Sequence, residues 1–230
     1  MLQKKSVFTI YLIGPTYTGK TYIIQKYVNH LDKYIFDYTR GIEFEYKTIN
    51  LDENTKIRLN ICDTSGMPYY KRFIFNPIKN RCDGIIFVYS INDKRSFDEL
   101  FNDFINPIKK IIDLNSIPVY LVGNECLPGE KREIEKEEAE NKLKEYEYNF
   151  KFMETCAKNN INLNELFQNI AEDMYKKYKE KEENQEINQI NQINQINENN
   201  NNIIIAQNNK PKKSVLQKVS NFFKRITKHF

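Results

Sequence analysis

The feature that most constrains the fold is a glycine-bounded segment directly after an apolar run. The run is Val7–Ile13, and the segment Gly14–Thr21 reads G-P-T-Y-T-G-K-T, which matches the pattern G-x-x-x-x-G-K-[ST]. The two glycines allow the backbone to curl until successive N–H groups point at a di- or triphosphate. Lys20 can reach the terminal phosphates, and the Thr21 hydroxyl can bind Mg²⁺. The segment therefore predicts a phosphate-binding loop between a strand and a helix.

Apolar runs alternate with helical patterns along the first part of the chain. Residues 84–90 and 117–123 are almost uninterrupted apolar runs, which is typical of parallel strands covered by helices on both faces. Residues 42–51 and 56–62 are joined by a short polar turn and predict an antiparallel hairpin. We therefore predict an α/β fold with a mostly parallel six-stranded sheet, one antiparallel strand and helices on both faces. The remaining strands are expected at 6–13 and 150–154, and the helices at 20–30, 94–114, 135–147 and 163–179.

The charge of the chain is divided unevenly. The 230 residues carry a net charge of +4, but residues 210–230 contain seven basic side chains and no acidic one, so the preceding residues are net acidic. A core that binds nucleic acid is therefore not expected. The four cysteines are widely spaced and form no C-x-x-C pair, which argues against a disulfide or zinc framework. No apolar run reaches the ~18 residues of a membrane-spanning helix. We expect a cytoplasmic protein.

The composition changes sharply after residue 178. Residues 179–209 consist almost entirely of Lys, Glu, Asn, Gln and Ile, and isoleucine recurs every three residues from Ile187 to Ile196. This spacing fits neither a helix nor a strand. We therefore predict a domain at 1–178 followed by a disordered Asn/Gln-rich linker at 179–209. A continuation of the preceding helix through residues 176–186 is the competing interpretation.

Residues 210–230 predict a basic amphipathic helix. Apolar side chains between Val215 and Phe230 recur on one helical face, and basic side chains lie on or beside the other. This composition favours peripheral association with an anionic surface of an intracellular membrane, and a protein partner is the alternative. The last cysteine of the chain is Cys156, so prenylation at the C-terminus is not expected.

A second motif follows the run at 56–62. Residues 63–66 read D-T-S-G and match D-x-x-G. Asp63 can hold Mg²⁺ through a water molecule, and the Gly66 N–H can approach a γ-phosphate. Alone, D-x-x-G is a weak signal that is commonly a turn. At a strand end downstream of a phosphate-binding loop it indicates a P-loop NTPase.

With both motifs in place, the sequence resembles the Ras-like small GTPases, and among them the Rab family, over roughly residues 5–178. Residues 39–44 are similar to the Rab effector loop, and residues 83–89 and 154–158 are similar to its fourth strand and base-binding loop. The resemblance implies that Thr39 joins Thr21 and Asp63 in a Mg²⁺ site. It also implies GTP or GDP as the ligand, bound by Gly14, Tyr17, Thr18, Gly19, Lys20, Thr21, Tyr22, Thr39, Gly66, Asn124, Cys156, Ala157 and Lys158.

Three positions depart from the family pattern. Met67 stands where the family has the glutamine that orients the attacking water. Of the two catalytic positions that the resemblance implies, Lys20 is retained and Met67 is degenerate. Thr16 replaces a glycine of Ras, although Rab loops commonly carry serine there. Leu127 replaces the aspartate that accepts hydrogen bonds from guanine. We expect slow hydrolysis and weaker or less guanine-specific binding, unless Glu130 or a shifted loop replaces the lost carboxylate.

The leading hypothesis is a Rab-like regulator of vesicle traffic that binds GTP or GDP with Mg²⁺. Effectors and exchange or activating factors are expected at residues 39–46 and 67–82, and the domain is expected to be monomeric. The alternative is a pseudo-GTPase interaction module with a fixed switch conformation and weak or relaxed nucleotide binding, which Leu127 and Met67 favour. A kinase that uses ATP is disfavoured because the chain lacks an arginine-rich lid.

Overall fold

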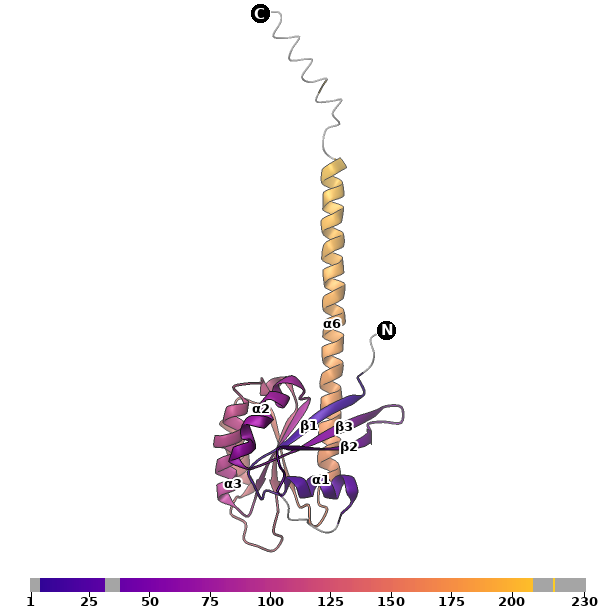
Figure 1. The fold of residues 1–230 in the computed structure, drawn as a ribbon. Coiled ribbons are helices and arrows are strands. Elements are labelled where there is room, and N and C mark those ends of the chain that lie inside the picture. Colours follow the sequence, from indigo (N-terminus) through magenta and orange to yellow (C-terminus); the bar gives the residue numbers. More distant parts are fainter. Residues whose placement is uncertain (1–4, 32–37, 209–216, 218–230) are drawn as a thin grey trace, which may run out of the picture. The chain divides into compact units, whose positions relative to one another are not determined.

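The computed structural model describes residues 5–31, 38–208 and 217, and it describes the side chains of these residues except those of 193–208. The chain divides into two units, Met1–Tyr178 and Lys179–Phe230. The helix predicted at 210–230 lies outside the described residues, apart from Gln217. Figure 1 shows the first unit as a central sheet between helices.

The sheet has six strands in the order β2-β3-β1-β4-β5-β6. Strands β2 and β3 pair antiparallel, and every other neighbouring pair is parallel. This topology confirms the predicted α/β fold with one antiparallel strand, and the resulting crossovers bring the carboxyl ends of β1, β3, β4, β5 and β6 to one edge. The strands are β1 (Val7–Ile13), β2 (Ile42–Asn50), β3 (Lys56–Thr64), β4 (Gly84–Ser90), β5 (Val119–Asn124) and β6 (Phe150–Thr155).

Each face of the sheet buries its own apolar cluster because successive strand side chains point to opposite faces. In β1, Ile10 and Leu12 belong to the cluster under α1 and the first turns of α6, where the Tyr27 ring stacks on Phe167 at a centroid distance of 3.9 Å. Tyr11 and Ile13 belong to the cluster under α2, α3 and α5. All seven residues of β4 are buried, which explains its uninterrupted apolar run. The helices are α1 (Lys20–Asn29), α2 (Lys71–Asn80), α3 (Lys94–Glu99), α4 (Asn106–Ile108), α5 (Lys136–Lys144) and α6 (Leu163–Asn208).

Two helical regions differ from the sequence prediction. The helix expected at 94–114 is divided into α3, a π-helical segment η2 (Leu100–Ile105) and α4. In this segment the Asn106 N–H bonds the Phe101 carbonyl five residues earlier. Helix α2 and the 3₁₀ turn η1 (Pro68–Tyr70) before it were not predicted. Pro77 lies inside α2 and hides its helical pattern, although Ile74 and Ile78 are spaced by four residues and both are buried.

The prediction of a disordered linker at 179–209 differs from the structure, in which α6 continues as a helix to Asn208. Elongation of a formed helix fixes one residue for each new hydrogen bond, whereas nucleation is the costly step. Buried Leu166, Phe167 and Ile170 hold the first turns of α6 against the sheet, so the helix is already nucleated when the polar repeat begins. Lys, Glu and Gln are also good helix formers. Among the described residues, none of the helices is long and apolar enough to span a bilayer.

Candidate functional site

The phosphate-binding loop predicted at 14–21 joins β1 to α1 and requires its glycines. A Cβ atom on Gly14 would lie 2.0 Å from the Val88 carbonyl oxygen, so only glycine fits against β4. Gly19 has a φ of +83°, a conformation that residues with a Cβ rarely adopt. A Cβ atom on Gly66 would lie 2.3 Å from the Thr16 nitrogen. The D-x-x-G motif therefore packs directly against the loop, as the two motifs predict together.

Lys20 is buried at the base of this loop. Its Nζ donates hydrogen bonds to the carbonyl oxygens of Gly14 at 2.9 Å and Pro15 at 2.7 Å. Burial lowers the pKa of Lys20 to about 8, and the nearby Asp63 carboxylate opposes this shift. Among the described residues, the hydrogen bonds of this buried ammonium group go to neutral carbonyls, and no carboxylate accepts one. A phosphate in the loop would give it an anionic partner.

Thr21, Thr39 and Asp63, the residues predicted to hold Mg²⁺, lie close together beside Lys20. The hydroxyls of Thr21 and Thr39 donate to Asp63 Oδ2 at 2.6 and 3.0 Å, and the two hydroxyls lie 3.1 Å apart. Asp63 Oδ1 is buried and has no hydrogen-bond partner among the described residues. Burial raises the pKa of Asp63, and the hydrogen bond from Thr21 opposes the rise. Hydroxyl and carboxylate oxygens are the ligands that Mg²⁺ prefers, so these residues fit the ion.

The phosphate-binding loop, Thr39 and the start of the segment 67–82, called switch II below, line a cavity of about 130 Å³. Met67 contributes to its wall at the position where a water-orienting residue is expected, and a thioether offers only a weak acceptor. Tyr38, Thr64 and Ser65 also line the cavity and were not among the predicted site residues. The lining residues are Thr16, Tyr17, Gly19, Lys20, Thr21, Tyr38, Thr39, Thr64, Ser65, Gly66 and Met67.

Asn124, at the end of β5, ties three segments together. Its buried side-chain amide donates to the Thr18 carbonyl at 3.1 Å and accepts from the Thr155 hydroxyl at 3.1 Å and the Ala157 N–H at 3.4 Å. Arg132 donates two hydrogen bonds to the carboxylate of Glu154, the residue before Thr155, at 2.7 and 2.9 Å. Asn124 therefore joins Thr155 and Ala157, both within the predicted loop at 154–158, to the phosphate-binding loop. This arrangement forms a second end of the site, next to the phosphate end.

Comparison with known proteins gives the family. The sequence profile of the Ras family matches residues 9–176. The Ras-related protein Rab-8A of Bos taurus is 34% identical over 171 residues, which cover 74% of this chain and 80% of that protein. Rab-8 of Diplobatis ommata is 34% identical and Rab-13 of Bos taurus 32% identical, each over 74% of this chain and over 79% and 81% of the relative. The chain belongs to the Ras family. Its relatives place it among the Rab-like small GTPases.

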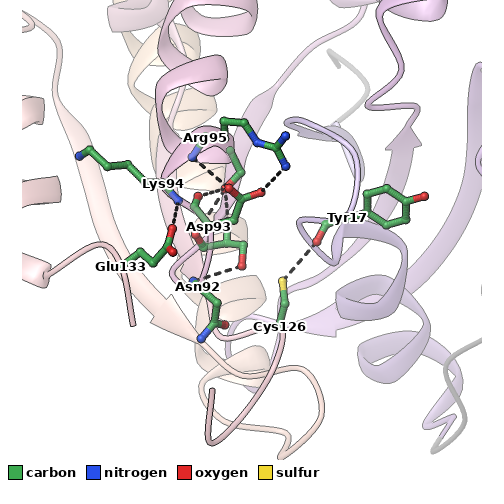
Figure 2. Close-up of polar contacts among 9 residues, drawn as sticks. Tyr17, Asn92, Asp93, Lys94, Arg95, Cys126 and Glu133 are labelled. Atoms are coloured by element: carbon green, nitrogen blue, oxygen red, sulfur yellow. Dashed lines mark hydrogen bonds and ion pairs between the residues drawn. The ribbon is translucent and has the colours of Figure 1, made fainter. Parts of the chain in front are cut away.

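The base-reading end of this Rab-like protein differs from the family pattern. Leu127 is 59% exposed, and its N–H bonds Asn92 Oδ1 at 3.2 Å. Glu130, the residue considered as a replacement for the missing carboxylate, is exposed. Cys126 was not predicted as a site residue, yet its thiol donates to the Tyr17 carbonyl at 3.5 Å (Figure 2). The same sulfur accepts a hydrogen bond from the Asn124 side chain at 3.3 Å. These contacts depend on the conformation of the loop. The only sequence signal for Cys126 is its position next to Leu127, where the family pattern is lost.

The remaining predicted binding residues lie around this core. Thr18 is buried, and its hydroxyl donates to the Pro15 carbonyl at 3.1 Å. Tyr22 is half-buried and packs against the apolar cluster under α1. Cys156 is buried and pairs with Ile161 through two backbone hydrogen bonds, while Lys158 is exposed. Tyr22 thus contacts the core, and the other three lie in the loop or turn expected for them.

Proposed function

We propose that this Rab-like protein binds GTP or GDP together with Mg²⁺ and acts as a switch with slow intrinsic hydrolysis. The observation that carries the proposal is the convergence of Thr21, Thr39 and Asp63 beside the buried Lys20. One carboxylate oxygen of Asp63 lacks a partner there among the described residues. Thr39 belongs to the segment 38–46, called switch I below, and Asp63 belongs to β3. A ligand that joins them couples both segments to the phosphate-binding loop.

Each residue of the cavity has a role in this proposal. Lys20 exchanges its bonds to the carbonyls of Gly14 and Pro15 for phosphate oxygens when nucleotide enters. Gly66 lies against the loop, and its N–H donates to a terminal phosphate. Bound at the Thr–Asp cluster, Mg²⁺ neutralises phosphate charge. Hydrolysis is slow because the Met67 side chain cannot both donate to and accept from an attacking water.

Exposed aromatic side chains on β2 and switch II supply a surface for effectors. Phe44 is 70% exposed on β2, and Tyr69 and Phe73 are exposed on η1 and α2. The Arg72 guanidinium lies over the rings of both Tyr69 and Phe73 at 5.4 and 4.8 Å from their centroids. Aromatic and arginine side chains are enriched where proteins bind one another. By the same proposal, these effectors act in vesicle traffic, and residues 210–230 attach the protein to an anionic membrane.

Nucleotide content and binding test the proposal directly. Full-length protein is heat-denatured and the released nucleotide is identified by chromatography. Binding of GDP, GTP and ADP with Mg²⁺ is then measured by calorimetry. We expect GDP or GTP to bind, with a smaller preference over ADP than a Rab protein that retains the aspartate. Lys20→Ala should abolish binding, and Lys109→Ala, directly after α4 and outside the cavity, is the matched control. A folded protein that binds none of the three nucleotides would contradict the proposal.

Membrane attachment needs a separate test. Flotation with vesicles that contain phosphatidylserine should carry the full-length protein upward, and vesicles of phosphatidylcholine alone should not. Phe222→Glu with Phe223→Glu should abolish flotation because two charges would enter the apolar face. If the double variant floats as well as the parent, the tail is not the anchor.

A further inference from the structure

Tyr17 lies in the phosphate-binding loop in an unusual backbone conformation. Its φ is +62°, in the left-handed region that residues with a Cβ adopt rarely, and bulky side chains more rarely still. Such conformations persist where surrounding contacts hold them, and they gather at functional sites. Tyr17 is also 65% exposed, so burial of its ring does not account for the conformation.

The contacts of Tyr17 join it to switch I across the cavity. Its hydroxyl forms a hydrogen bond with the hydroxyl of Tyr38. The two rings meet edge to face, with centroids 5.9 Å apart and an interplanar angle of 67°. Both residues line the cavity, and Tyr38 is 53% exposed, so the pair lies at the solvent side of the phosphate pocket.

Two further contacts fix the pair at both ends. Thr39, the residue after Tyr38, lines the cavity, and its hydroxyl donates to the buried Asp63 at 3.0 Å. On the other side, the Cys126 thiol donates to the Tyr17 carbonyl, and Figure 2 shows this carbonyl turned toward Cys126 while the phenol ring points away from it. Two consecutive residues of switch I are thus held in place: Thr39 by its hydrogen bond to Asp63, and Tyr38 by its contact with Tyr17.

We propose that Tyr17 and Tyr38 form an aromatic clasp that closes the mouth of the phosphate cavity and slows nucleotide release. A nucleotide whose phosphates contact Lys20 and Thr21 leaves past this rim, so the Tyr17–Tyr38 contact breaks before the ligand departs. Tyr17 is a positioning residue in this account, since it acts through switch I. The proposal rests on the nucleotide binding proposed above, and it names a regulator of that site.

Release of a fluorescent GDP analogue from full-length protein tests the clasp. Tyr17→Phe and Tyr38→Phe each remove one hydroxyl, and each should speed release about fivefold, the effect of one hydrogen bond. Because both substitutions remove the same bond, the double variant should release no faster than either single variant. Tyr148→Phe, just before β6 at the opposite end of the sheet, is the control and should leave release unchanged. Unchanged release in Tyr17→Phe, or a multiplied effect in the double variant, would overturn the clasp.

Tyr17→Gly separates a positioning role from a structural one. Glycine adopts a φ of +62° freely, so this variant should unfold at the same temperature as the parent or higher, yet release the analogue faster. If the parent binds no nucleotide, the binding proposal fails, and the clasp is tested in the free protein by hydrogen–deuterium exchange. The amides of residues 38–41 should then exchange faster in Tyr17→Phe than in the parent. Equal exchange there would overturn the clasp.

Discussion

At the scale of single residues, Met67 has the largest consequence for chemistry. It lines the cavity where a side chain must both donate to and accept from the attacking water, and its sulfur does neither well. Met67→Gln should therefore raise single-turnover GTP hydrolysis by on the order of tenfold or more. Met67→Leu, which is similar in volume and has no amide, should hydrolyse at the parent rate. Equal rates for Met67→Gln and the parent would show that another step limits hydrolysis.

Two buried tyrosines give a matched test of stability. The Tyr89 hydroxyl is buried and has no partner among the described residues, and burial raises the Tyr89 pKa. The Tyr120 hydroxyl donates to Asp173 at 2.6 Å. In urea unfolding at pH 7, Tyr89→Phe should leave the free energy of unfolding unchanged or raise it by up to about 1 kcal/mol. Tyr120→Phe should lower it by about 1 kcal/mol. Equal losses in both variants would mean that Tyr89 has a partner, such as a buried water molecule.

At the scale of elements, helix α6 gives the sharpest contrast between sequence and structure. Residues 179–208 are helical, although their Asn/Gln repeat predicts disorder. Removal of residues 179–230 should therefore reduce the total ellipticity at 222 nm by the contribution of these helical residues. Ile190→Pro in the full chain should remove part of the same signal, because proline costs about 3 kcal/mol inside a helix. The thermal unfolding of the first unit should not change. A truncation that raises the mean helicity per residue would favour the disordered linker.

The elements that the sequence predicts well are those with long, consistent patterns. The apolar runs at 84–90 and 117–123 correspond to β4 and β5, whose residues are all buried. The hairpin of β2 and β3 has a short polar turn. Helix α2 is harder to recognise because Pro77 lies inside it and only Ile74 and Ile78 mark its buried face. The extension of α6 depends on the anchored turns before it, which local composition does not show.

The candidate site also contains some contacts that the sequence predicts and others that it does not. Asp63 lies near the carboxyl end of β3, and Thr21 lies in α1 just after the loop that leaves the carboxyl end of β1. Because β1 and β3 are parallel neighbours, the proximity of the two residues follows from topology. The clasp and the Cys126 contact arise from loop backbone geometry, above all from the positive φ of Tyr17. Sequence patterns describe residue types and spacing. They do not specify which loop conformation brings Tyr17 into contact with Tyr38 and Cys126.

At the scale of the whole molecule, ligand binding and the stability of the first unit are linked. The site joins the ends of β1, β3, β5 and β6 through Lys20, Asp63 and Asn124, so a bound nucleotide stabilises segments that are distant in sequence. A ligand at a hundred times its dissociation constant adds about 2.7 kcal/mol to the free energy of unfolding. For a domain of this size each kcal/mol raises the melting temperature by roughly 2–4 °C, so we expect a rise of roughly 5–11 °C with GDP and Mg²⁺.

The dependence of this rise on the metal separates the two ends of the site. Addition of EDTA should remove most of the rise, because Asp63 Oδ1 would again lack its partner in the buried cluster. Asp63→Asn keeps the shape of the side chain without its charge, and GDP with Mg²⁺ should stabilise this variant less than the parent. Leu127→Asp restores a carboxylate at the base-reading end, so it should enlarge the rise with GDP and not the rise with ADP. A rise that is insensitive to EDTA and to Asp63→Asn would place the ligand away from the Thr–Asp cluster.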